Sequence, residues 1–319
     1  MIEVQNITKR FGPITAVDGV SFEVKKGEVA GFLGPNGAGK TTIMRILTGF
    51  IPATEGTAKL AGYDVFENSL EVRKRVGYLP ENAPLYLDMG VVEFLDYIAS
   101  VRNIPPQKRK ASLERMIDVC GLQTVLKQEI SELSHGFRQR VGMAQAMIHD
   151  PEILIMDEPT SGLDPNQIIG IRSLIKELGR EKTVILSTHI LSEVEATCSR
   201  VIIIDRGKIV ADGSLDEVTK RGKKGKVHHL RVRGDRPAWE KKLKGLAGVR
   251  SFTWKEEEGG LNLYEVFTEG DRALGEELFR LAADSGMTLA ELFQEKTTLE
   301  NVFTQLTQNQ EPGTRNQKP

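Results

Sequence analysis

The sequence predicts an α/β fold with a mostly parallel sheet at its centre, followed by a small α+β domain. Residues 1–219 alternate short β-rich runs with helical patterns, which is typical of α/β layers. The runs 153–156, 183–186 and 201–204 are continuously apolar, as expected of strands that are covered on both faces of a parallel sheet. A basic, glycine-containing run at 220–227 predicts a linker, and a chain of 319 residues is long enough for about two domains.

The first predicted domain contains a helical insertion. The sheet is expected to have a β-rich edge, and further strands are expected at residues 20–24 and 76–79. Between about residues 84 and 147 the apolar residues recur at helical spacing, which predicts a helical subdomain inserted between strands. One face of this pattern carries Val92, Leu95, Ile98 and Ala99.

Residues 228–307 predict a second, smaller domain with the order β-α-β-β-α-β, which is typical of a ferredoxin-like unit. Its predicted elements are a strand at 230–232, a helix that contains Trp239, strands near 249–254 and 261–267 around a turn at Gly259 and Gly260, a helix that contains Leu278, a strand at 287–289, and a closing helix that begins at a capping box from Thr297 to Glu300. The tail at 308–319 has no large apolar residue, so we expect it to be disordered.

A glycine-rich motif follows the apolar run 29–33 and precedes a helical pattern, in the strand–loop–helix order that a phosphate-binding loop requires. Its residues are Gly34, Pro35, Asn36, Gly37, Ala38, Gly39, Lys40 and Thr41, followed by Thr42. Glycines let backbone N–H groups turn toward phosphate oxygens, and the helix N-terminus adds its positive dipole. Lys40 would contact the β- and γ-phosphates, and the Thr41 hydroxyl would bind Mg²⁺. The motif predicts binding of ATP or GTP; the alternative is a glycine-rich turn with an incidental lysine.

Two acids end the apolar run at 153–156. A strand end is where such a sheet presents catalytic groups, so Asp157 is expected to hold Mg²⁺. Glu158 is placed to polarise a water molecule for attack on the γ-phosphate. The alternative, acids that only decorate a helix N-terminus, is weaker beside a phosphate-binding loop.

Further motifs resemble the ATP-binding cassette family of transport ATPases, over essentially all of residues 1–219. The first motif is residues 133–140, which lead into a predicted helix, and the second is residues 159–165. The third is the histidine that follows the predicted strand at 183–187. The resemblance implies that Ser134 and Gly136 belong to the family's signature motif, which contacts the γ-phosphate held by an opposite subunit. It further implies an adenine-stacking role for Phe11, a loop from Ser161 to Asp164 that links the two sites, and a switch role for His189.

Two positions depart from the family's pattern. His135 follows the signature serine where the family commonly has glycine, and it adds a titratable ring near the expected interface. Glu81 stands where the family usually has a glutamine that helps to bind Mg²⁺. A carboxylate can also bind Mg²⁺, but it places a negative charge beside the triphosphate, so we expect an altered metal or pH dependence.

The resemblance implies the ATP-hydrolysing subunit of a membrane exporter, with ATP and Mg²⁺ as cofactors and a separately encoded permease as partner. Two chains, identical or paralogous, would enclose two ATP molecules. The C-terminal unit looks like the extension of gliding-motility, multidrug and polysaccharide export ATPases. Residues 84–87 are expected to dock the permease, and packing within the helical subdomain is the alternative role for them. The alternatives are a soluble ATPase of this fold in translation or DNA repair, and a nucleotide-binding regulatory module that does not hydrolyse.

Composition fits these expectations. Lys and Arg number 43 against 44 Asp and Glu, a formal net charge of −1, which does not favour a nucleic-acid partner. Cys120 and Cys198 lie among apolar residues and are expected to be buried thiols. No apolar run reaches about 18 residues, and the N-terminus lacks the pattern of a signal peptide. We therefore expect a cytoplasmic protein that is peripheral on the inner face of the cell membrane through its permease.

Overall fold

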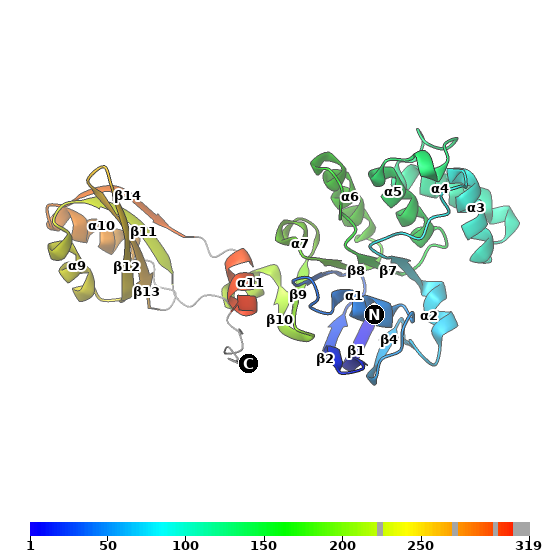
Figure 1. The fold of residues 1–319 in the computed structure, drawn as a ribbon, viewed down its shortest axis with the longest axis horizontal. Helices are drawn as coiled ribbons and strands as arrows, with labels where there is room; N and C mark the ends of the chain where they lie inside the picture. Colours follow the sequence, from blue (N-terminus) through cyan, green and yellow to red (C-terminus); the bar gives the residue numbers. More distant parts are fainter. Residues whose placement is uncertain (222–225, 270–273, 296–298, 309–319) are drawn as a thin grey trace, which may run out of the picture. The chain divides into compact units, whose positions relative to one another are not determined.

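The computed structural model describes residues 1–221, 226–269, 274–295 and 299–308. The chain divides into two compact units, Met1–Leu215 and Asp216–Pro319 (Figure 1). The sequence places the boundary slightly later, after residue 219, and helix α8 (Leu215–Arg221) spans both positions. The expected capping residue Thr297, residues 222–225 of the predicted linker and residues 309–319 of the predicted tail lie outside the described residues.

The first unit has a six-stranded main sheet in the order β10-β9-β3-β8-β7-β6. Its strands are β3 (Val29–Leu33), β6 (Val76–Leu79), β7 (Ile153–Asp157), β8 (Thr183–Thr188), β9 (Arg200–Asp205) and β10 (Lys208–Ser214). Only β10 runs antiparallel to its neighbour. Every residue of β3, β7 and β8 is buried, which confirms the prediction from the continuously apolar runs. Because the strands are parallel, the loops that follow β3, β7 and β8 meet at one edge of the sheet.

A second, antiparallel sheet covers helix α1 (Lys40–Leu47) from the other side, as Figure 1 shows. Its strands are β1 (Ile2–Phe11), β2 (Ile14–Val24), β4 (Glu55–Leu60) and β5 (Tyr63–Asp64). Ile43, Met44 and Leu47 of α1 are buried in the core between the two sheets. The rings of Phe22 in β2 and Phe32 in β3 meet edge to face, with their centroids 5.0 Å apart. The helix that follows the phosphate loop is therefore held by both sheets.

The predicted helical subdomain is present. The helices of this unit are α2 (Ser69–Arg75), α3 (Val91–Val101), α4 (Pro106–Cys120), the short 3₁₀ helix η1 (Ile130–Glu132), α5 (His135–Met147), α6 (Pro165–Leu178) and α7 (Leu191–Thr197). The prediction for one helical position was wrong: Val92 is 38% exposed, whereas Val91 is buried with Leu95 and Ala99. The buried stripe begins at the first residue of α3, directly after Gly90, and a spacing of four and eight residues from Val91 reaches Leu95 and Ala99.

The second unit contains a four-stranded antiparallel sheet in the order β12-β13-β11-β14. Its elements are β11 (Val227–Arg233), α9 (Arg236–Gly245), β12 (Val249–Glu258), β13 (Leu261–Thr268), α10 (Gly275–Asp284), β14 (Thr288–Gln294) and α11 (Leu299–Gln308). The order from β11 to β14 is the predicted β-α-β-β-α-β. Gly259 and Gly260 join β12 to β13 with φ angles of 60° and 76°, a conformation that favours glycine at both turn positions.

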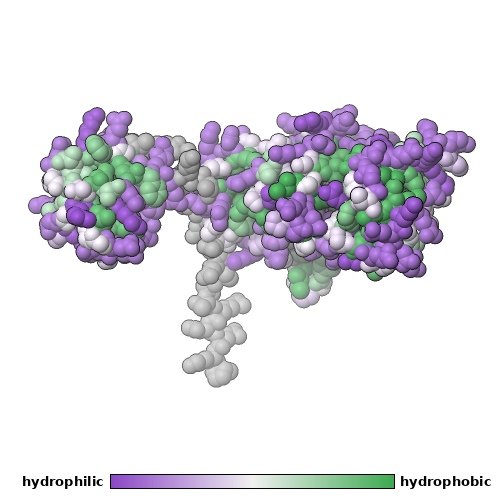
Figure 2. All heavy atoms as spheres, turned by 90° about the horizontal axis from the view of Figure 1, so that it is seen from above, coloured by the Kyte–Doolittle hydropathy of each residue, from purple (hydrophilic) through white to green (hydrophobic). Residues whose placement is uncertain are grey.

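The surface is mainly hydrophilic on the face drawn in Figure 2, with smaller hydrophobic areas between the charged residues. Among the helices of the described residues, none combines the length and the apolar character that a membrane span requires. Cys120 and Cys198 are buried free thiols, as predicted, and burial raises the pKa of each to about 12. Both thiols therefore stay protonated and pack as small hydrophobic groups.

Candidate nucleotide-binding and hydrolysis site

The glycine-rich loop lies between β3 and α1, as the sequence predicts. Gly39 is the residue before α1 and has a φ of 106°, which strains any residue with a side chain. A Cβ atom at Gly34 would collide with the backbone carbonyl of Ile204 in β9. Gly207 donates its N–H to the carbonyl of Ala38 at 2.9 Å. The loop is thus held against neighbouring strands with its N–H groups at the start of a helix, an arrangement that suits phosphate oxygens.

Lys40 is buried at the first position of α1, only 5% exposed. Its Nζ atom donates to the carbonyl of Gly34 at 2.7 Å and to that of Pro35 at 3.3 Å. It also lies 3.4 Å from a carboxylate oxygen of Glu158. The loop therefore curls around the ammonium group, and the cation is placed where an anion can enter between the loop and Glu158.

Asp157 ends β7 and is 1% exposed. One of its carboxylate oxygens accepts a hydrogen bond from the hydroxyl of Ser187 in the neighbouring strand β8. The other, Oδ2, is buried and has no hydrogen-bond partner among the described residues. A buried charged oxygen without a partner is costly, so a cation ligand fits this position. Burial raises the pKa of the nearby Tyr78 to about 12, and the charge of Asp157 adds to the rise.

Glu158 and His189 come from adjacent strand ends and meet directly. Glu158 is buried and has a φ of 47°, which turns its side chain out of the strand direction. Its N–H donates to the carbonyl of Ser187 at 3.0 Å, so the turn is tied to β8. Its Oε2 atom lies 2.9 Å from Nδ1 of His189, while Oε1 faces Lys40. The structure thus brings together the three predicted catalytic side chains Lys40, Glu158 and His189.

The remaining predicted metal ligands lie near this edge of the sheet. Thr41 is the second residue of α1, directly after Lys40. Glu81 follows the end of β6 by two positions, on the same edge as Asp157 because β6 and β7 are parallel, and its side chain is exposed. The described residues contain no group of three or more His, Cys, Asp or Glu side chains that could hold a metal. A Mg²⁺ ion that also binds phosphates and water is usually held by one or two carboxylates, so Asp157 and Glu81, together with the Thr41 hydroxyl, suit it.

Ser134, Gly136 and Asp164 form a separate group at the starts of α5 and α6. Ser134 caps α5 and accepts from the N–H of Phe137 at 3.4 Å. Asp164 caps α6 and accepts from the N–H of Gln167 at 3.0 Å. A Cβ atom at Gly136 would collide with the side chain of Gln167, so the two helix starts lie close together. Within the described chain, no hydrogen bond or ion pair joins these three residues to Lys40, Glu158 or His189.

Phe11 is half-exposed at the end of β1, and Nζ of Lys9 lies 5.1 Å from the centre of its ring. An exposed ring at a strand end is available for stacking on a base.

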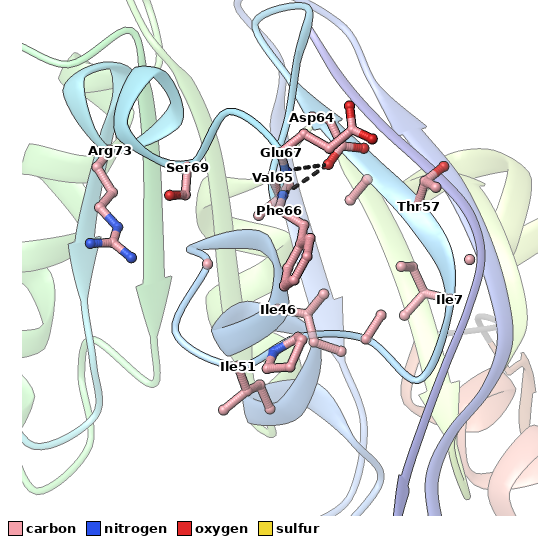
Figure 3. Close-up of a pocket in the computed structure, with 15 residues that line it drawn as sticks. Ile7, Ile46, Ile51, Thr57, Asp64, Val65, Phe66, Glu67, Ser69 and Arg73 are labelled. Atoms are coloured by element: carbon pink, nitrogen blue, oxygen red, sulfur yellow. Dashed lines mark hydrogen bonds between the residues drawn. The ribbon is translucent and has the colours of Figure 1, made fainter.

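A cavity of about 400 Å³ lies elsewhere in this unit, between β4, the end of α1 and the start of α2 (Figure 3). Phe66 and Ile46 line it, and Asp64 accepts hydrogen bonds from the N–H groups of Phe66 and Glu67 at 2.9 and 3.0 Å. None of the three catalytic side chains lines this cavity.

No sequence motif points to the residues that surround the acidic pair. Ser187 binds both Asp157 and the N–H of Glu158. Thr160 and Thr188 both bind the buried carboxyl group of Glu193. Such contacts could have been suspected only from the polar residues that interrupt apolar surroundings at the ends of β7 and β8.

Comparisons with known proteins show which proteins this chain is similar to. The family described as ABC transporter matches residues 17–161. An uncharacterised ABC transporter ATP-binding protein of Synechocystis sp. is 45% identical over 202 residues, which are 62% of this chain and 56% of that protein. The linearmycin resistance ATP-binding protein of Bacillus subtilis is 31% identical over 308 residues, 96% of this chain and 98% of that protein. A solved structure described as the ATP-binding subunit of an ABC transporter is 27% identical, with a TM-score of 0.64, over 69% of this chain and 92% of that chain.

Proposed function

Because the chain belongs to the family of ABC transporter ATP-binding proteins, we propose that it hydrolyses ATP to drive a separately encoded permease. The observation that supports this most strongly is the meeting of Lys40, Glu158 and His189 beside the phosphate loop. A protein that only bound nucleotide would have no need to bury an acid against a histidine and a lysine at this place.

The loop and Lys40 bind and orient the substrate. The N–H groups from Gly37 to Thr41 would surround the phosphates, and Lys40 would exchange its contacts with the Gly34 and Pro35 carbonyls for oxygens of the β- and γ-phosphates. Phe11 would stack on the adenine. Mg²⁺, when bound, neutralises charge on the phosphate oxygens, and Thr41, Asp157 and Glu81 are the residues that would hold it.

Glu158 is the group that would accept a proton from the attacking water. Its carboxylate is held on one side by Lys40 and on the other by His189, so its orientation is set before substrate arrives. The His189 side chain is 45% exposed, which leaves the rest of the ring free to face the γ-phosphate. The chemistry therefore depends on positioning and electrostatics, as phosphoryl transfer generally does.

Ser134, Gly136 and Asp164 would complete the site of a second copy, either identical or paralogous. They make no hydrogen bond or ion pair with the catalytic group of their own chain within the described residues, although a hydroxyl and a helix N-terminus favour an anion. Two chains arranged head to tail would place each signature group over the other's phosphate loop. Binding of ATP would close the dimer, and hydrolysis would release it.

Export is the direction that we propose, because a relative that matches 96% of this chain is named for resistance to linearmycin. The permease would dock at residues 84–87, next to α3. Tyr86 and Leu87 are half-exposed there, and the ring of Tyr86 contacts that of Tyr97 at 5.6 Å between centroids. An exposed apolar group of this kind suits a helix of a partner. The protein would then lie at the inner face of the cell membrane, on its cytoplasmic side.

The deciding experiment measures phosphate release by the purified protein and by Glu158→Gln. Loss of the general base predicts a fall of about 10²-fold or more in kcat, with nucleotide binding retained. Glu152→Gln is the matched control, since Glu152 is an exposed acid at the opposite end of β7. Size-exclusion chromatography with ATP should show the Glu158→Gln protein as a dimer. Equal turnover by both proteins would refute the assignment of Glu158, and no turnover in the unmodified protein would refute autonomous hydrolysis.

A further inference from the structure

The side chain of Glu193 connects the two loops that carry Glu158 and His189. Glu193 lies in α7 and is 2% exposed. Its Oε2 atom accepts a hydrogen bond from the hydroxyl of Thr188 at 2.6 Å, and its Oε1 atom accepts one from the hydroxyl of Thr160. Thr188 immediately precedes His189, and Thr160 follows Glu158 by two positions. One carboxyl group therefore joins the end of β8 to the loop after β7.

Burial of this acid needs an explanation. A carboxylate that leaves water loses its hydration, and an apolar residue would fill the same place at lower cost. Glu193 forms no ion pair within the part of the chain that the structure describes. The two threonine hydroxyls are charge-assisted donors, one to each oxygen, and they satisfy the carboxylate without a cation. The two hydrogen bonds that join the loops are therefore what stabilises the buried carboxylate.

The backbone of Glu193 is also fixed. Its N–H donates to the carbonyl of Ile190 at 3.1 Å, and its own carbonyl accepts from the hydroxyl of Thr197 at 2.6 Å. The hydroxyl of Thr188 accepts from the N–H of Ile190 at 3.0 Å, so its hydrogen must point toward Glu193. These bonds give the carboxyl group one orientation and make the link stiff.

We propose that Glu193 is a positioning residue for ATP hydrolysis, which sets where Glu158 and His189 stand relative to each other. The inference rests on the proposed function, since it concerns the geometry of that site. Glu193 acts through Thr160 and Thr188. Without it the two loops move independently, and the 2.9 Å contact between Glu158 and His189 loses its fixed geometry. Misplacement of a catalytic group by about 1 Å can lower a rate about 10²-fold.

The test begins with Thr160, where one variant removes the hydroxyl and another keeps it. Thr160→Val has nearly the same shape but cannot donate to Glu193, whereas Thr160→Ser still can. We expect kcat of Thr160→Val to fall by at least about tenfold, with the dissociation constant for a fluorescent ATP analogue changed less than about threefold. Thr160→Ser should keep most of the turnover, because it retains the bond.

Glu193→Ala and Glu193→Gln give the second comparison. A glutamine can accept from Thr188 through its oxygen and donate to Thr160 through its nitrogen, so it should rescue part of the turnover that alanine loses. Adding Thr160→Val to Glu193→Ala should lower kcat little further, because both changes break the same link. If Glu193→Ala does not fold, the two Thr160 variants decide.

Two results would overturn the inference while the unmodified protein hydrolyses ATP. One is a Thr160→Val protein with an unchanged kcat. The other is a parallel loss of kcat, nucleotide affinity and thermal stability, which would show that Glu193 supports only the general structure. Absence of turnover in the unmodified protein would instead reject the proposed function, and the inference with it.

Discussion

Replacing Gly39 by alanine tests whether the phosphate loop depends on glycine geometry at this one position. Gly39 has a φ of 106°, and a Cβ atom there would lie 2.5 Å from the carbonyl oxygen of Ala16. A left-handed conformation costs an L-residue about 1–2 kcal/mol. The collision with a backbone atom in β2 adds about 1–3 kcal/mol to the loss of stability, as overpacking typically does.

Gly37→Ala separates these two contributions. Gly37 lies in the same loop with a φ of 79°, but a Cβ atom there would meet nothing within 4 Å. Gly37→Ala should therefore lose only the free energy that the left-handed conformation costs, about 1–2 kcal/mol. Urea unfolding of both variants without nucleotide measures the difference, which should be about 1–3 kcal/mol against Gly39→Ala. Equal unfolding free energies would refute the claim that β2 confines the loop at Gly39.

Three further predictions concern pH, metal and partner. Burial, helped by the positive charge of Arg102, lowers the pKa of His149 to about 4, so the folded protein disfavours its protonation. The free energy of unfolding therefore keeps its full value above pH 6.5 and decreases as the pH falls toward 4, by roughly 3 kcal/mol at most. Urea unfolding of His149→Gln should show a smaller decrease over the same pH range than the unmodified protein shows. Glu81→Gln should change the Mg²⁺ concentration that gives half-maximal turnover, and an unchanged value would show that Glu81 does not influence the metal. Leu87→Asp should abolish copurification with the permease while ATP binding persists, whereas Val119→Asp, at another half-exposed position, should not; retained copurification of the first variant would reject the docking surface.

The parts of the fold that the sequence predicts well are those with local signals. Strand β3 and the start of α1 follow from an apolar run, a glycine-rich loop and a helical pattern, and the turn at Gly259 and Gly260 follows from the need for positive φ. The start of α3 was harder. Both Val91 and Val92 are apolar, and the packing of α3 against α4 and α5 decides which of them is buried.

The residues of the site were found by motif, whereas their contacts were not. Glu158 and His189 directly follow two different strands, so their 2.9 Å contact depends on the register of β7 against β8, which pairs Asp157 with Ser187. A shift of β8 by one residue would turn its side chains to the opposite face of the sheet and separate the two groups. Glu193 belongs to no motif, and its partner Thr160 is close in space but 33 positions away in the sequence. Tertiary packing supplies this information.

The same packing explains why so many polar groups are buried at this edge of the sheet. Lys40, Asp157 and Glu158 are each less than one tenth exposed, and each would cost free energy alone. Lys40 and Glu158 compensate each other's charge, and one oxygen of Asp157 accepts a hydrogen bond from the Ser187 hydroxyl. Removing one member leaves the others without partners and costs more than its own contact. A site built in this way is fixed before substrate binds, and phosphoryl transfer by positioning requires such a site.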